Sequence, residues 1–315
     1  MIFLKCNKCN RKDIKTVKEV RVKNETYKKL ESGFASWLET LGYAKSTVTG
    51  SPALVREFFF YLENKQVLSL EQVTGPVIKD YFAYLGQRKH TRKSQGLSIQ
   101  TIRNNYCALR RLGKYLRETT QGNLEVSLTL PKAPQQIKTI LTRKEIGELY
   151  HATGQTALGI RDKAMLSVFY GCGLRRNEGV NLDVTDILAD KNKILVRKGK
   201  GSKERLVPIT MAIREDLENY LVNARTVLTA DNPKETAFFV SVRGNRISGQ
   251  MLYERLQQLK EKAGIEKEIG LHTLRHSIAT HLLKGGMKIE MVSRLLGHSS
   301  LESTQIYTHI MYEEI

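Results

Sequence analysis

Apolar residues recur every three or four positions through most of the first 120 residues, a spacing that places them on one face of an α-helix. The pattern predicts four helices, over residues 26–41, 52–64, 75–88 and 99–118. The clearest apolar stripe lies in the last of them and consists of Ile99, Ile102, Tyr106, Leu109, Leu112 and Leu116. No segment here alternates apolar and polar residues as a half-buried strand does, so we expect an all-helical first domain.

The pattern changes in the second half of the chain. Residues 193–197 and 204–209 are rich in β-branched and aliphatic residues and are joined by the polar, glycine-containing segment 198–203, which predicts a hairpin. We expect a third short strand at 237–241 and helices elsewhere. The expected fold class is mainly α: an all-helical N-terminal domain, then a mixed domain of helices with a small antiparallel sheet.

A break in the helical pattern separates the two halves. Pro131 and Pro134 interrupt it, and Thr142 with Glu145 forms the capping box of a new helix. We therefore expect a leader over residues 1–23, a first domain over 24–127, a linker over 128–141 and a second domain over 142–315.

Charge then narrows the class of partner. The 315 residues carry a formal net charge of +19, and residues 1–140 hold 25 basic against 11 acidic side chains. Such an excess favours a polyanionic partner, nucleic acid or an anionic membrane surface. No apolar run is long enough to span a membrane, and no secretory signal is recognisable.

The four cysteines do not have the spacing of a disulfide framework, so we expect a cytoplasmic protein. Cys6 and Cys9 form half of a zinc knuckle at best, since no second pair follows at suitable spacing. We interpret this segment as a basic leader, with metal-dependent ordering as the alternative, and we expect neither a resident metal nor a cofactor.

Basic residues also form a line on the helix predicted at 99–118. Four cations fall within about 60° of one another beside the apolar stripe, and the preceding loop adds four more. The predicted DNA contacts are Arg103, Arg110, Lys114 and Arg117 on the helix and Arg88, Lys89, Arg92 and Lys93 in the loop. The alternative is a solvated charged face, which the charge of the whole domain disfavours.

Candidate catalytic side chains are concentrated near the C-terminus, where five of the seven histidines lie. His272 and Arg275 are three residues apart, so a helix would place them on one face. A zinc site of His272 and His276 is disfavoured, because Thr273 stands where the metalloprotease pattern has Glu. By spacing alone, His298 after the helix-capping Gly297 could be a loop histidine, and Tyr307 a half-buried tyrosine.

Two further basic residues stand near glycines. Arg175 lies at a helix start, where Glu178 could anchor it while it reaches a phosphate. Lys200 lies at the predicted hairpin tip, where most lysines are simply solvated. Neither glycine-containing segment matches a dinucleotide-binding fingerprint or a P-loop.

Taken together, these residues occur in motifs that resemble the tyrosine recombinase (phage integrase) family, in the family's order. The motifs are Gly-Leu-Arg175-Arg-Asn-Glu, Gly-Lys200-Gly-Ser-Lys-Glu-Arg, His272-Thr-Leu-Arg275-His, Leu-Gly-His298-Ser-Ser and Gln-Ile-Tyr307-Thr-His. The resemblance is strong over 142–310 and weaker over 24–125, where length and helix count are similar to the family's core-binding domain. The layout is most similar to Xer-type and other short recombinases.

The resemblance implies the catalytic roles. Tyr307 would attack a scissile DNA phosphate and form a 3′-phosphotyrosyl intermediate, while Arg175 and Arg275 bind the non-bridging oxygens. Lys200 would protonate the departing 5′ oxygen, and His272 and His298 would serve proton transfer and phosphate hydrogen bonding. Side-chain cations would take the place of a metal in this chemistry.

The expected function is therefore site-specific recombination of DNA, with a homotetramer acting on two synapsed inverted-repeat sites in the nucleoid. Two alternatives remain open at this stage. A type IB topoisomerase-like relaxer would use the same nucleophile without synapsis, and a DNA-binding regulator would keep the fold without catalysis.

Overall fold

The computed structural model describes residues 20–88, 96–130, 139–197 and 204–297. The chain divides into two compact units, residues 1–135 and 136–315, each with its own hydrophobic core. The mainly helical fold class predicted from the sequence is confirmed. None of the helices in the described ranges is both long and apolar enough to cross a membrane.

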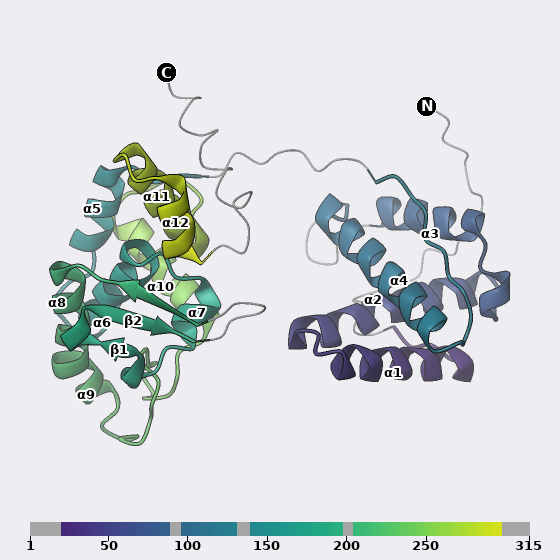
Figure 1. Ribbon diagram of the computed structural model, residues 1–315, viewed down its shortest axis with the longest axis horizontal. Helices are drawn as coiled ribbons and strands as arrows, with labels where there is room; N and C mark the ends of the chain where they lie inside the picture. The colour runs from purple at the N-terminus through teal and green to yellow at the C-terminus, as the bar shows by residue number, and fades with distance from the viewer. Residues whose placement is uncertain (1–19, 89–95, 131–138, 198–203, 298–315) are drawn as a thin grey trace. The chain divides into compact units, whose positions relative to one another are not determined.

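The described part of the N-terminal unit contains four α-helices and a short 3-10 helix at Leu70–Gln72 (Figure 1). The α-helices are α1 (Glu25–Thr40), α2 (Lys45–Asn64), α3 (Gly75–Gln87) and α4 (Ile99–Glu118). α1 packs along α2, and α4 packs against both. The apolar stripe of α4 faces this core as predicted, with Leu109, Leu112 and Leu116 almost fully buried. An extended segment, residues 122–130, then buries Leu124 and Val126 under α4.

The start of α2 differs from the sequence prediction. The helix begins at Lys45 rather than near residue 52, so Pro52 lies inside it. Proline has no N–H to donate to the carbonyl four residues earlier and normally ends a helix. Here Pro52 and Val55 are buried against the core, and this packing outweighs the one missing hydrogen bond.

In the C-terminal unit, a small sheet packs against helices (Figure 1). The helices are α5 (Arg143–His151), α6 (Ala157–Leu166), α7 (Arg176–Val180), α8 (Met211–Asn219), α9 (Thr226–Leu228), α10 (Gly249–Lys262), α11 (Leu271–Lys284) and α12 (Ile289–Leu296). The predicted hairpin is confirmed as β2 (Lys193–Val196) paired antiparallel with β3 (Arg205–Pro208). The predicted capping box of Thr142 and Glu145 also forms at the start of α5.

The third strand is not the predicted one. β1 (Ile187–Leu188) pairs with β2, whereas residues 237–241 make only isolated bridges, between Asp183 and Ala237 and between Val240 and Arg246. Four consecutive residues of this segment, Ala237 to Val240, are fully buried. Such a segment runs through the core instead of extending a sheet with one exposed face.

A buried ion network ties α6 to α10. The Asp162 carboxylate is fully buried and contacts Arg161 at 3.4 Å and the Nε of Arg255 at 3.0 Å. Arg161 is itself buried and donates from Nη1 to the Val240 carbonyl at 3.0 Å. Removing one partner from such a cluster leaves uncompensated buried charge.

We therefore expect Asp162→Ala to lower the free energy of unfolding of the C-terminal unit by about 3–5 kcal/mol. Urea denaturation followed by circular dichroism measures it. Glu254→Ala, an exposed change on α10, is the control and should shift stability by less than about 0.5 kcal/mol. Fluorescence of Trp37, which lies in the N-terminal unit, should report an unchanged transition. A decrease for Asp162→Ala no larger than that of the control would contradict this role.

Candidate active site

Arg175 is presented at a sharp change of backbone direction. α6 is followed by a π-helical turn, Ser167–Gly171. Gly173 then adopts a φ of +62°, and Arg175, in an extended conformation, is the N-cap of α7. A Cβ on Gly173 would lie 2.6 Å from a methyl group of Leu296, so this position requires glycine both for its backbone conformation and for its close packing. The turn brings Arg175 to the end of α12.

Glu178 fixes Arg175 as the sequence predicted. Its carboxylate accepts the Arg175 backbone N–H at 2.7 Å on Oε2 and the Arg175 Nη1 at 2.9 Å on Oε1. A glutamate three residues into a helix commonly accepts the N-cap backbone N–H in this way. These contacts hold the Arg175 side chain while it stays 35% exposed.

Arg275 reaches the same place from α11. It is only 3% exposed, and its guanidinium donates to the carbonyl of Gly173 and, at 2.7 Å, to that of Leu296. Arg175 donates from Nη2 to the carbonyl of Gly297 at 2.9 Å. Two arginines from different elements therefore bind the consecutive carbonyls of residues 296 and 297 at the C-terminal end of α12.

The end of α12 suits these cations. The last carbonyls of a helix have no partner within the helix and carry the negative end of its dipole. Gly297 ends α12 with a φ of +64°, which confirms the predicted glycine cap. His298, the next residue in the sequence, lies outside the described residues.

A third arginine of the site, Arg205, binds the same Glu178 carboxylate as Arg175. Arg205, the first residue of β3, donates from Nη1 to Oε1 and from Nη2 to Oε2, both at 2.9 Å. Burial alone would raise the pKa of Glu178, but hydrogen bonds and charge from Arg205 and Arg175 outweigh it and lower the pKa to about 2. Glu178 is therefore ionised at all physiological pH values.

His272 lies one helical turn before Arg275 on α11, at an exposed position. Its pKa is lowered, first by partial desolvation and then by the positive charges of Arg275, Arg176 and Arg175. The lowered pKa favours the neutral imidazole, the form that can accept a proton.

The structure thus brings together three of the six predicted catalytic residues, Arg175, His272 and Arg275. Lys200, His298 and Tyr307 lie outside the described residues. Sequence reasoning assigned no role to Arg205, although it belongs to the motif quoted around Lys200. Only the tertiary contact with Glu178 reveals it, because the two residues are 27 positions apart.

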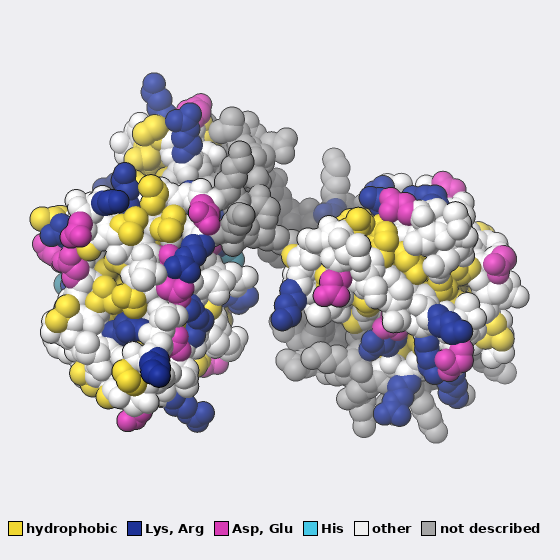
Figure 2. Space-filling view, turned by 60° about the horizontal axis from the view of Figure 1, so that its bottom comes forward, with side chains coloured by type: hydrophobic (Ala, Val, Ile, Leu, Met, Phe, Trp, Pro, Cys, Tyr) yellow, Lys and Arg dark blue, Asp and Glu magenta, His cyan; other side chains and the backbone are white. Residues whose placement is uncertain are grey.

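The predicted DNA contacts lie in the other unit. Arg110, Lys114 and Arg117 are exposed on α4, and Arg103 is half-buried on the same helix. Figure 2 shows basic side chains gathered toward the lower edge of the N-terminal unit, on the right in that view. Arg88 instead turns inward, 14% exposed, and pairs with the buried Glu57. Lys89, Arg92 and Lys93 lie outside the described residues.

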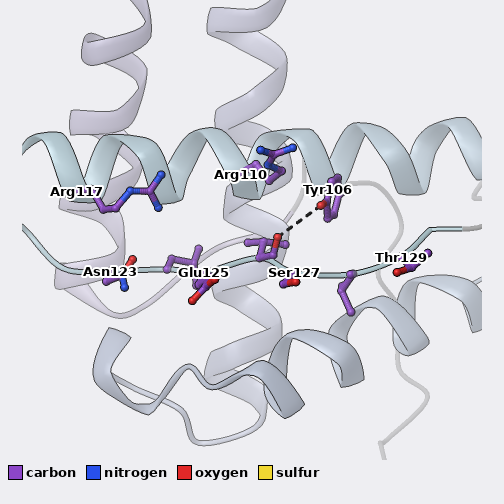
Figure 3. A pocket seen from close by; sticks show the side chains of 10 residues that line it. Tyr106, Arg110, Arg117, Asn123, Glu125, Ser127 and Thr129 are labelled. Atoms are coloured by element: carbon purple, nitrogen blue, oxygen red, sulfur yellow. Dashed lines mark hydrogen bonds between the residues drawn. The ribbon is translucent and has the colours of Figure 1, made fainter.

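A polar groove of about 660 Å³ runs between α4 and the extended segment 123–129. Tyr106, Arg110 and Arg117 project into it from the helix, and the Tyr106 hydroxyl donates to the Val126 carbonyl at 3.5 Å (Figure 3). Glu125 on the facing segment is the acidic residue among its lining side chains.

Metal-ligating side chains do not cluster in the described ranges: no group of three or more His, Cys, Asp or Glu residues there could hold an ion. Cys6 and Cys9 lie outside those ranges, while Cys107 and Cys172 are free thiols. The charged groups described at the candidate site are therefore side-chain cations and one carboxylate.

The low pKa of Glu178 predicts a contribution to stability that is present above its unfolded value of 4.5 and disappears as pH falls toward 2. We expect Glu178→Gln to remove about 3 kcal/mol of the acid-induced decrease in stability between pH 5 and pH 2. Urea denaturation at a series of pH values measures it, with the exposed Glu254→Gln as the control. Parallel pH profiles for wild type and Glu178→Gln would contradict the assignment.

Comparison with known proteins connects this geometry to a family. Residues 139–314 match the model of the phage integrase family, and residues 26–116 match that of the phage integrase SAM-like domain. The chain is 32% identical over 293 residues to tyrosine recombinase XerC 2 of Ralstonia nicotianae, covering 91% of this chain and 82% of that protein. It is 33% identical over 282 residues to tyrosine recombinase XerD of Bifidobacterium longum, covering 87% and 90%.

Solved structures share the fold. XerH site-specific recombinase bound to difH substrate in a pre-cleavage complex matches with a TM-score of 0.67 at 22% identity, over 94% of this chain and 89% of that one. A lambda integrase tetramer bound to a Holliday junction matches with a TM-score of 0.64 at 15% identity, over 89% and 76%. The matches reported favour neither the relaxer nor the regulator. With two arginines set on one helix end and both family models matched, the chain belongs to the tyrosine recombinase (phage integrase) family and is a site-specific DNA recombinase of the Xer type.

Proposed function

We propose that Tyr307 is the nucleophile of this recombinase and that Arg175, Arg275, Lys200, His272 and His298 complete its active site. The Tyr307 hydroxyl oxygen attacks the scissile phosphorus, the bond from phosphorus to the 5′ oxygen breaks, and a 3′-phosphotyrosyl link forms. Lys200 supplies the proton to the departing 5′ oxygen. Attack by that 5′ hydroxyl, or by one from a second site, reverses the step and rejoins the DNA.

The observation that carries this proposal is the arrangement of the two arginines. Arg175 and Arg275 come from different elements yet bind consecutive carbonyls, so their guanidinium groups are held near each other before any substrate arrives. The side chain of Arg175 stays 35% exposed, so part of it is accessible to a ligand. Preorganised donors of this kind stabilise the charge that develops on the phosphate.

His272 supports the same chemistry. Desolvation and the neighbouring arginines lower its pKa and favour the neutral imidazole, which can accept a proton from the attacking tyrosine or a hydrogen bond within the phosphate site. Side-chain cations supply the positive charge, so the proposed reaction uses no metal and no other cofactor.

The domain roles follow. We propose that residues 24–127 form a core-binding domain that clamps DNA through the cations of α4, that residues 128–141 link it to the catalytic domain over 142–315, and that residues 1–23 are a basic leader. The substrate is double-stranded DNA with inverted-repeat sites, synapsed by a homotetramer in the cytoplasmic nucleoid. The XerH and lambda integrase structures, solved on DNA, support this proposal.

Tyr307→Phe should abolish covalent attachment to DNA while leaving binding unchanged. The assay incubates the protein with EDTA and duplexes from its own locus that carry inverted repeats, then resolves protease-sensitive adducts on denaturing gels. Tyr312→Phe is the matched control, because Tyr312 lacks the surrounding motif and should leave the adduct intact. An adduct that persists in Tyr307→Phe would assign the nucleophile elsewhere.

The role of α4 predicts a change in salt dependence. Replacing Arg103 and Arg110 with Ala should weaken DNA binding and reduce the slope of log K against log salt by about 1 for each phosphate that the protein no longer neutralises. Fluorescence anisotropy at several salt concentrations measures the slope. The control, Lys28→Ala with Lys29→Ala, removes the same charge from α1. Equal slopes for the α4 variant and wild type would remove this helix from the interface.

A further inference from the structure

Arg205 has a contact pattern that the proposed roles leave unexplained. Its Cα pairs with Val196 at the end of the described hairpin, and its guanidinium binds both oxygens of Glu178. The side chain is 14% exposed, so it is a largely buried cation with a bidentate carboxylate partner. Bidentate arginine–carboxylate pairs are among the strongest hydrogen-bonded pairs in proteins and fix orientation as well as distance.

The Arg205–Glu178 pair changes the net charge around Arg175. Glu178 carries one negative charge and is shared by two guanidinium groups, so the trio retains a net positive charge. With Arg175 as its sole partner, the same carboxylate would neutralise that arginine and attract it away from an anionic ligand. The exposed member of the trio is Arg175, at 35%, against 14% for Arg205 and 6% for Glu178.

The main chain around Gly297 adds a second link. A Cβ on Gly297 would lie 2.7 Å from the Nε of Arg205, so the backbone at the end of α12 approaches the Arg205 side chain closely. The carbonyl of Gly297 accepts the hydrogen bond from Arg175 Nη2. Arg205 therefore binds the carboxylate of Glu178 and lies close to the backbone of residue 297, the two groups that hold Arg175.

We propose that Arg205 is a positioning residue for Arg175. Arg205 balances the negative charge of Glu178 and fixes its orientation. Glu178 can then hold Arg175 while the three side chains together keep a net positive charge. This inference rests on the proposed function, in which Arg175 binds the scissile phosphate. Arg205 itself need not touch the DNA.

The test measures single-turnover cleavage of a nicked duplex that carries the site identified by the Tyr307 assay. Arg205→Met keeps the length of the side chain and removes its charge. Cleavage should slow by about 10- to 100-fold, the effect expected for one charge-assisted hydrogen bond, while the DNA dissociation constant changes by less than about twofold. Arg205→Lys restores the charge without the fork and should recover part of the rate.

The decisive variant is the double change Glu178→Gln with Arg205→Met. Removing the carboxylate charge also removes the attraction that would draw Arg175 away from phosphate, so the double variant should cleave faster than Arg205→Met alone. Residues in contact couple in stability with either sign, so urea denaturation of both variants separates this rescue of cleavage from a recovery of folding. A double variant as slow as the single variant, or slower, would overturn the proposal.

Arg197→Ala is the matched control. Arg197 directly follows β2, the partner strand of β3, and pairs with Asp183 and Asp186 at 2.7 Å, without contact to Glu178. Its removal should leave cleavage within about threefold of wild type, whereas equal slowing by Arg197→Ala and Arg205→Met would overturn the proposal.

Wild type without any adduct on its site would contradict the proposed function itself. An adduct formed equally fast by wild type and Arg205→Met would contradict the Arg205 inference alone.

Discussion

The C-terminal end of α12 is the point on which the candidate active site depends. Its last carbonyls need partners, and the partners are two arginines that belong to different segments of the chain. Arg275 also binds the carbonyl of Gly173, just before Arg175. One set of hydrogen bonds therefore joins α11, α12 and the turn into α7, and the same cations that hold the backbone are those proposed to bind the substrate.

The use of the same arginines to hold the backbone and to bind a phosphate has an electrostatic requirement. Guanidinium groups gathered near one another repel, and a site for a phosphate must keep net positive charge in spite of its need for anchoring carboxylates. Backbone carbonyls anchor Arg275 without neutralising it. Glu178 anchors Arg175, and the second cation on that carboxylate preserves the charge of the cluster. Desolvation and the same positive charge lower the pKa of the neighbouring His272, because both disfavour its protonated form.

The arginines of the N-terminal unit fall into two groups, those paired with carboxylates and those at the polar groove. Arg88 and Arg56 are partnered by the carboxylates of Glu57 and Glu31 and stabilise the helix packing. Arg110 and Arg117 on α4 instead border a polar groove. A count of basic residues therefore overstates the number available to DNA, because Arg88 and Arg56 are engaged by carboxylates.

The sequence by itself determined the helices of the first unit, the β2–β3 hairpin, the glycine cap of α12 and the pairing of Arg175 with Glu178. Each depends on residues a few positions apart, whose spacing and capping chemistry are visible in the chain. The early start of α2 and the buried course of residues 237–241 were decided by packing, which outweighs local preference. The contacts of Arg175 with Gly297, 122 residues away, and of Arg275 with Gly173, 102 residues away, exist only in the folded chain. The contact between Arg205 and Glu178 likewise depends on tertiary packing. The local sequence around a strand residue does not indicate which distant carboxylate it will contact in the folded chain.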